Sequence, residues 1–327
     1  MTDYKKVSQG RDYTVELWRF VFCIVVLGLH FFSKTSYSFF RAGYLGVEFF
    51  FLLSGFGIWQ FYLKKMAGQK LSDRLYQFGL YIGGRLKRLY PLYLLSLLCM
   101  LFLRTWQYHW SIGEIIAYLK TGWAEFLMLQ CGPLGNEVLI SANWYVAAMF
   151  MGSILLLCLL MLAGRWGGLL ICPVLSLSIY YYYYFRLIRK IDVIYSYHAV
   201  LRALAGLGIG IFIGSLIRLL QEKVSQGKLS LRISTGKKKL LQELIYCLAN
   251  GILAAIVIYT NFGRRSAGDF VVIALFAVCL FGLFLVKKEI PQKLSVVFQK
   301  LGAVTYPVYL FQMPIIEWLV IIGILHT

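Results

Sequence analysis

Long apolar runs, separated by short polar segments, make up most of the chain. Each run is close to the roughly 20 residues that an α-helix needs to cross the hydrocarbon core of a bilayer. The pattern therefore predicts an all-α protein, a polytopic transmembrane helical bundle with about nine or ten spans. The candidate spans are residues 15–34, 44–63, 89–104, 144–163, 167–184, 198–217, 243–260, 269–286 and 303–324.

A long mixed segment, residues 105–143, lies between the third and fourth of these runs. It carries Glu114, Lys120, Glu125 and Glu137 among apolar residues. Its pattern fits either a tenth span or a helix that lies in the membrane interface.

The placement of basic residues separates these two alternatives. With nine spans and a cytoplasmic amino terminus, 23 of the 33 Lys and Arg residues fall on the cytoplasmic side and nine fall outside. A full crossing at residues 112–130 would invert all later spans and place the basic segment 218–242 outside. Cytoplasmic loops normally carry the excess of Lys and Arg. We therefore expect 105–143 to be an outer re-entrant or interfacial segment and 218–242 to be a basic cytoplasmic loop.

Composition supports a membrane protein and excludes a soluble one. Of the 327 residues, 60% are hydrophobic and 14% are charged, and the mean hydropathy is +0.72. A soluble domain carries roughly 25% charged residues, so we expect residues 1–327 to form a single integral-membrane domain. The net charge of +19 does not indicate nucleic-acid binding, because the basic residues cluster between apolar runs. The seven cysteines show no spacing typical of a metal site or a disulfide framework.

Five ionisable residues inside predicted spans stand out, because a charged group there is costly and is a functional candidate by default. They are Arg19, His30, Glu48, Arg202 and Glu317. A purely structural membrane protein would have no need of them, so the chemistry of the chain is expected to involve some of these positions.

Arg19 and His30 are eleven residues apart on the first span, close to three helical turns, so they share a face. Their backbones are about 16 Å apart along the helix. A snorkelling arginine and a hydrogen-bonded histidine would explain the pair without chemistry. An imidazole can also take a proton from a hydroxyl near neutral pH, which makes His30 a candidate general base.

The second span begins with a run from Gly46 to Phe56 that contains Glu48, Ser54 and Gly55. Close helix packing is a sufficient explanation for the two small residues. An unpaired carboxylate in lipid would cost several kcal/mol. We therefore expect Glu48 to face a partner such as His30, an arginine or water.

Arg85 and Arg88 open the third span from the cytoplasmic side as i,i+3 neighbours on one helical face. They can serve as topology signals only. Two guanidinium groups on one face also form a fork that suits phosphate oxygens.

Five motifs in this order give the chain a resemblance to the membrane acyltransferase-3 family, the bacterial integral-membrane O-acyltransferases that decorate cell-surface glycans. The resemblance covers nearly the whole chain. The motifs are Arg19 with His30, the run Gly46 to Phe56, Arg85-x-x-Arg88-x-x-Pro91, Asn143-Trp144-Tyr145, and Leu301-Gly302 followed by Tyr306 to Phe311. At the end of the last motif, members often carry a histidine, where this chain has Gln312. The family usually counts ten helices.

The resemblance implies transfer of an acyl group, most often acetyl, from cytoplasmic acyl-CoA to a hydroxyl at the outer face. Acyl-CoA would be a co-substrate, with no permanently bound cofactor. Arg19, Arg85 and Arg88 would then bind the phosphates, and His30 would act as base or acyl carrier. Glu48 would orient His30 or stabilise its protonated form.

Four further residues of the matching segments are expected near the site, as substrate contacts or packing residues. They are Ser54, Asn143, Trp144 and Tyr309.

The expected location is the bacterial cytoplasmic membrane, with membrane lipid, acyl-CoA and a surface glycan or glycolipid acceptor as partners. Either the chain completes the transfer itself or a separate extracellular transferase receives the acyl group. The rival interpretation is a transporter or flippase for a glycan or lipid intermediate, which would show similar spans and buried charges.

Overall fold

The computed structural model describes residues 13–131, 138–187, 189–194, 197–226, 235–286, 288 and 290–325. These residues form helices and connecting segments without a β-strand, which confirms the all-α prediction for the described part of the chain. The longer helices are α1 (Tyr13–Phe32), α2 (Gly46–Lys65), α3 (Leu71–Tyr108), α4 (Ile112–Thr121), α6 (Trp144–Trp166), α7 (Cys172–Arg186), α8 (His198–Ser225), α9 (Thr235–Phe262), α10 (Gly268–Val286) and α11 (Gln292–Ile321). The short ones are η1 (Gly43–Leu45), α5 (Trp123–Phe126), η2 (Ser141–Asn143) and the π-helical turn η3 (Gly167–Ile171).

Eight helical stretches of the described chain are long and apolar enough to cross a membrane. One of them, Ser141–Arg186, has 46 residues, a length of about 69 Å at 1.5 Å per residue. Gly164 interrupts this stretch with φ 60° and ψ −141°, a positive-φ backbone conformation that favours glycine. The stretch is therefore divided into two helices, α6 and α7, and the described residues contain nine candidate crossings when these two are counted separately.

The segment expected at the outer face, residues 105–143, contains no helix that could be a tenth crossing within its described part. Its first residues belong to α3, which continues to Tyr108. Helix α4 has ten residues and is therefore about 15 Å long, half the thickness of a hydrocarbon core. Ser111 and Glu114 start it with a reciprocal capping box. The position of this segment relative to a membrane stays a prediction.

The boundaries of the basic segment 218–242 differ from the expected loop. Helix α8 continues to Ser225 and α9 begins at Thr235, so both ends are helical, and residues 227–234 lie outside the described part. An ion pair between Arg218 and Glu222, 2.7 Å apart one helical turn from each other, supports the extension of α8.

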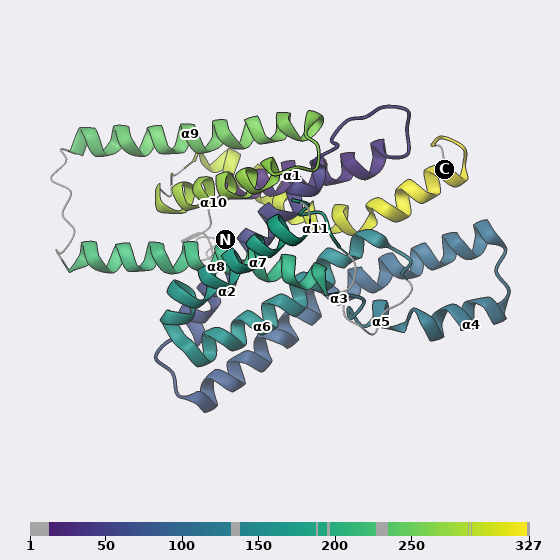
Figure 1. Cartoon of the computed structure of the whole chain (residues 1–327), viewed down its shortest axis with the longest axis horizontal. Coiled ribbons are helices and arrows are strands. Elements are labelled where there is room, and N and C mark those ends of the chain that lie inside the picture. The colour runs from purple at the N-terminus through teal and green to yellow at the C-terminus, as the bar shows by residue number, and fades with distance from the viewer. Residues whose placement is uncertain are drawn as a thin grey trace.

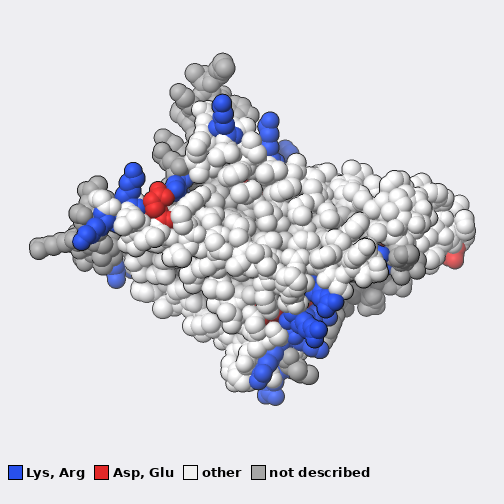
Figure 2. Space-filling model, turned by 90° about the horizontal axis from the view of Figure 1, so that it is seen from above, with Lys and Arg blue, Asp and Glu red and all other residues white. Residues whose placement is uncertain are grey.

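Figure 1 shows α8 and α9 extending together past the other helices, at the end opposite to α4 and the end of α11. Figure 2 shows Lys and Arg side chains at the margins of the molecule, with broad uncharged surface between them. This distribution is the one a multi-pass membrane protein needs, because charge belongs outside the hydrocarbon core.

The centre of the bundle is made by α2 and α8, which lie directly against each other. A Cβ at Gly55 would collide with the carbonyl oxygen of Leu207, and one at Gly210 with that of Leu52. These two glycines therefore allow the backbones to touch, as small residues do between membrane helices. Packing thus explains Gly55, as expected from the sequence.

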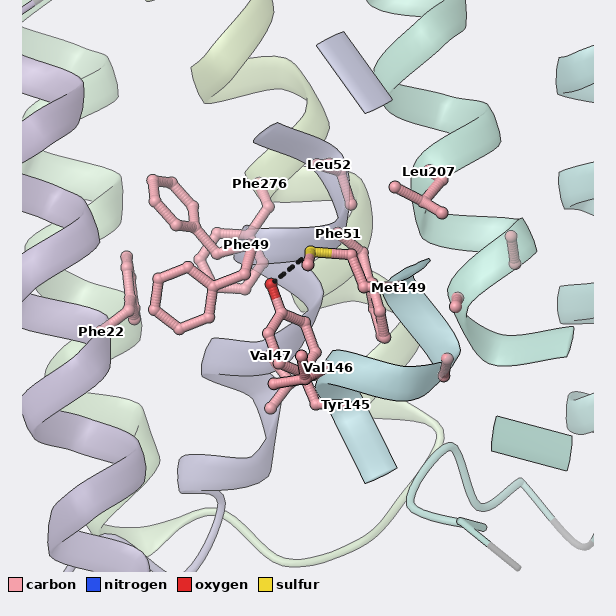
Figure 3. Close-up of a cluster of buried hydrophobic side chains, with 14 of the residues drawn as sticks. Phe22, Val47, Phe49, Phe51, Leu52, Tyr145, Val146, Met149, Leu207 and Phe276 are labelled. Atoms are coloured by element: carbon pink, nitrogen blue, oxygen red, sulfur yellow. Dashed lines mark hydrogen bonds between the residues drawn. The ribbon is translucent and has the colours of Figure 1, made fainter. Parts of the chain in front are cut away.

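An aromatic cluster joins α1, α2 and α10 beside this centre (Figure 3). The rings of Phe22, Phe49 and Phe276 pack with centroid distances of 4.7, 5.0 and 5.5 Å. On the other side of the same cluster, Tyr145 at the start of α6 points its hydroxyl at the sulfur of Met149. These contacts fix α6 next to α2 and position the inner wall of the site described below.

Candidate active site

A cavity of about 390 Å³ opens between α1, α2, α3, α6 and α11. Such a volume is typical of small-molecule sites. Its wall includes most of the residues that the sequence singled out for binding: Arg19, Ser54, Arg85, Arg88 and Tyr309. These residues come from four different helices, so the fold itself brings them together.

One end of the cavity carries the basic residues. Arg19 lies 2.7 Å from Glu16, one turn earlier on α1, and its side chain is 27% exposed. Arg85 and Arg88 reach the same space from α3, and the guanidinium of Arg85 lies 5.2 Å from the ring centroid of Tyr81. With three arginines and one carboxylate, this end has a net positive charge and suits an anionic ligand.

Helix α11 holds α1 and α3 around the cavity. The thiol of Cys23 donates to the carbonyl oxygen of Thr305 at 3.3 Å, and the carboxylate of Glu16 lies directly against Gly302. On the other side, the hydroxyl of Tyr306 donates to the carbonyl oxygen of Leu89 at 2.8 Å. The glycine in the Leu-Gly pair of the last motif therefore makes room for the carboxylate that pairs with Arg19.

The opposite end of the cavity is closed by polar aromatic residues. The hydroxyl of Ser54 donates to the sulfur of Met149 at 3.3 Å. The rings of Tyr145 and Tyr309 meet edge to face with centroids 5.2 Å apart. The hydroxyl of Tyr309 donates to the carbonyl oxygen of Ala142 at 2.7 Å, which joins α11 to the turn before α6.

His30 lies on the same uninterrupted helix as Arg19, as the sequence predicts. It is partly exposed near the end of α1, and its carbonyl oxygen accepts a hydrogen bond from the hydroxyl of Ser33 at 2.7 Å. It is not part of the cavity wall.

Glu48 has an arginine as its partner, one of the three expected alternatives. The carboxylate and the guanidinium of Arg202 are both 0% exposed and 2.5 Å apart. The hydroxyl of Tyr180 donates to the same carboxylate at 3.3 Å. The described structure shows no hydrogen bond between Glu48 and His30, so a direct orienting contact is not supported in this conformation.

Arg202 is the hub of a larger buried network. It lies 3.2 Å from a carboxylate oxygen of Asp192, donates to the carbonyl oxygen of Tyr44 at 3.1 Å, and lies 5.0 Å from the ring centroid of Trp144. Asp192 also pairs with the exposed Arg265 at 2.6 Å. The network therefore fixes Trp144, and it connects α2, α6 and α8 to two connecting segments.

Asn143 is fully buried directly before α6, and Gln312 is 1% exposed on α11. Asn143 occupies the N-cap position without using its side chain as a cap. The amide nitrogen and oxygen of both side chains form no hydrogen bond within the described residues. These groups are costly to bury unpaired, which marks them as candidates for ligand contacts.

Glu125 organises the segment that precedes Asn143. Its carboxylate accepts hydrogen bonds from the backbone N–H groups of Leu139 and Ile140 at 2.6 and 3.1 Å. Burial raises the pKa of Glu125 to about 7, although these hydrogen bonds act in the opposite direction. The protonation of the Glu125 carboxyl is therefore coupled to the position of the turn that bears Asn143.

A second hollow of about 470 Å³ lies on the outside of α3 and α11 and contains no polar side chain. It is lined by Leu98, Cys99, Phe102, Leu103, Phe311, Pro314, Ile315 and Trp318. Close in sequence to this lining, Glu317 pairs with Arg104 at 3.1 Å, which accounts for the ionisable residue of the last span. This apolar surface suits lipid tails and provides no catalytic group.

No cluster of His, Cys, Asp and Glu within the described chain could hold a metal ion.

Sequence reasoning did not identify Asp192, Glu125 or Gln130 as members of these networks. None carries a signal in its immediate sequence, because their partners are seven to 73 residues away. Glu16 could have been found, since it stands three residues before Arg19, on the same helical face.

The sequence model of a family described as an acyltransferase domain (Acyl_transf_3) matches residues 12–326. The chain belongs to this acyltransferase family. Comparisons with curated proteins and with solved structures give no significant match. The acyltransferase assignment agrees with the resemblance noted in the sequence, and the chain is accordingly a multi-pass membrane acyltransferase.

Proposed function

We propose that this acyltransferase moves an acyl group, most often acetyl, from cytoplasmic acyl-CoA to a hydroxyl of a surface glycan or glycolipid at the outer face of a bacterial plasma membrane. The observation that carries the proposal is the convergence of Arg19, Arg85 and Arg88 on one cavity. Planar guanidinium groups suit the phosphates of the coenzyme. The positive end of the cavity would hold the phosphorylated part of acyl-CoA in water. The thin pantetheine arm, which ends in the thioester, would extend toward the opposite end.

The direction of the arm follows from α1. This helix runs without interruption from Arg19 to His30, a rise of about 16 Å. An extended pantetheine arm spans a similar distance, so the thioester can approach His30 while the phosphates stay with the arginines.

In the proposed reaction, Nε2 or Nδ1 of neutral His30 takes the proton from the acceptor hydroxyl. The acceptor oxygen forms a bond to the thioester carbonyl carbon, and the carbon–sulfur bond breaks. The CoA thiolate leaves with the electron pair and recovers the proton from the imidazolium. In the alternative, the imidazole nitrogen attacks the thioester carbon, the carbon–sulfur bond breaks, and the CoA thiolate takes the proton that the ring loses. The acyl–nitrogen bond then breaks as the acceptor hydroxyl, or a nucleophile of a separate extracellular transferase, takes the acyl group and returns a proton to the ring.

Glu48 contributes in this scheme through Arg202. The buried pair fixes α2 against α8, and Arg202 fixes Trp144 through its ring face. We therefore assign Glu48 a positioning role through Arg202 instead of the direct action on His30 that the family resemblance implied.

The rival function is a transporter or flippase for a glycan or lipid intermediate. The test is acetyl-CoA binding and turnover by purified protein in nanodiscs, with released CoA detected by a thiol reagent. The proposal expects saturable binding of CoA and acetyl-CoA, and release of CoA when acceptor is supplied in a membrane extract. A protein that binds neither nucleotide and releases no CoA would be a transporter or have some other activity.

A further inference from the structure

The side-chain amides of Asn143 and Gln312 are buried and form no hydrogen bond within the described residues. Their neighbours place both residues close to the cavity. Tyr309 lines the cavity, and its hydroxyl donates a hydrogen bond to the carbonyl oxygen of Ala142, the residue before Asn143. Gln312 follows Tyr309 by three residues on the same helix. Asn143 and Gln312 are therefore both next to this contact between α11 and the turn before α6, which is called the seam below.

The level of Gln312 can be read from the packing of α1 against α11. Contacts between Glu16 and Gly302 and between Cys23 and Thr305 occur in the same order along both helices, so the two helices run in the same direction. His30 follows Cys23 by seven residues, and Gln312 follows Thr305 by seven residues. Seven residues are about two turns, or about 10 Å. Counted from the contact between Glu16 and Gly302, Gln312 is instead level with Val26. Gln312 is therefore level with the last turns of α1, between Val26 and His30.

Asn143 is held in place independently of its own side chain. The amide nitrogen of Gln130 donates to the hydroxyl of Tyr93 at 3.0 Å and to the carbonyl oxygen of Asn143 at 3.4 Å. The oxygen of the Gln130 amide is also unpaired within the described residues. The surrounding structure thus fixes the backbone of Asn143 while its side-chain amide stays available.

We propose that Asn143 and Gln312 bind the pantetheine arm of acyl-CoA by hydrogen-bonding to its amide groups. This inference rests on the proposed function. Each side chain offers N–H donors and a carbonyl acceptor, which matches the N–H and carbonyl of a secondary amide. The arm of the coenzyme carries two such amides between its phosphates and its thioester. Both side chains are almost completely buried, and the seam suits a thin chain better than a sugar ring.

The test compares two ligands on purified protein in nanodiscs. CoA carries the arm, whereas adenosine 3′,5′-bisphosphate carries phosphates and no arm. Gln312→Met and Asn143→Leu approximately preserve the size of the side chain and remove the amide. We expect each variant to weaken CoA binding by about fivefold or more, as for the loss of one or two hydrogen bonds. Binding of adenosine 3′,5′-bisphosphate should not change.

The stability of the ligand-free protein gives a second readout. Because these amides have no hydrogen-bond partner within the described residues, replacing them with apolar groups of similar shape should leave the melting temperature unchanged or raise it. Gln107→Met makes the same chemical change near the end of α3, about 21 Å along that helix from Tyr93, and should not affect CoA binding.

Equal CoA affinity in the parent, Gln312→Met and Asn143→Leu proteins would overturn the inference. So would an equal loss of affinity for both ligands, because the effect would then not involve the arm. If the parent itself binds neither ligand, the proposed function fails as well, so the two failures are distinguishable.

Discussion

Replacing Arg202 by Met should destabilise the protein more than any other single change in the buried ion network. The guanidinium is fully buried between Glu48 and Asp192. Its removal leaves the Glu48 carboxylate buried without a positive partner, and breaking such a pair costs about 3–5 kcal/mol. Loss of the contact with the Trp144 ring adds about 0.5–2 kcal/mol.

A double-mutant cycle separates this effect from simple loss of packing. Glu48→Gln alone leaves Arg202 with Asp192 and should cost less than Arg202→Met. The combined variant removes both members of the pair, so its loss should be smaller than the sum of the single losses, by about 1–3 kcal/mol. Arg265→Met is the matched control, because Arg265 is 61% exposed in the same network and should cost less than about 1 kcal/mol.

Unfolding of the purified variants in detergent, followed by tryptophan fluorescence during denaturant titration, measures these differences. Additive losses in the cycle would show that Glu48 and Arg202 do not act as a pair. A Glu48→Gln variant with normal stability and strongly reduced acyl transfer would instead support a direct role for Glu48 in the chemistry.

Three further predictions concern the donor, the outer segment and the topology. Arg85→Lys and Arg88→Lys keep the charge but lose the planar fork, so acetyl-CoA binding should weaken without a change in topology; unchanged binding would make them topology signals only. The pKa of Glu125 in the folded protein is raised to about 7, so its contribution to stability falls as pH rises from about 4.3 to 7. The melting temperature should therefore decrease over this range, and Glu125→Gln should remove the part of the decrease that Glu125 causes. In a cysteine-free background, a cysteine at Ser36 should react with an impermeant reagent in intact cells and one at Ser225 should not; the reverse would refute the cytoplasmic amino terminus.

The hydropathy pattern predicted the crossings well because the membrane requires apolar helices of a defined length. It located the first span at residues 15–34, close to α1 at Tyr13–Phe32. It placed the third span at 89–104, whereas α3 covers Leu71–Tyr108. Hydropathy marks only the part of a helix that is apolar, so it does not detect a polar continuation outside the hydrocarbon core.

The candidate site was partly predictable for the same reason. Arg19, Arg85 and Arg88 share a cavity because helical periodicity and topology already place them at one end of the bundle. The partner of Glu48 could not be read from the sequence, since Arg202 is 154 residues away. Buried amides such as Asn143 and Gln312 give no hydropathy signal, and only the structure shows that they have no hydrogen-bond partner among the described residues.

The most direct test of the account is acyl transfer by a His30→Gln variant. Glutamine keeps some hydrogen-bonding capacity and removes the titrating imidazole, and His30 lies outside the wall of the cavity proposed to bind the donor. Loss of a general base typically reduces the rate about 10²–10⁴-fold. The account predicts normal expression, retained acetyl-CoA binding, and acyl transfer reduced at least about a hundredfold. Transfer at close to the parental rate would contradict it.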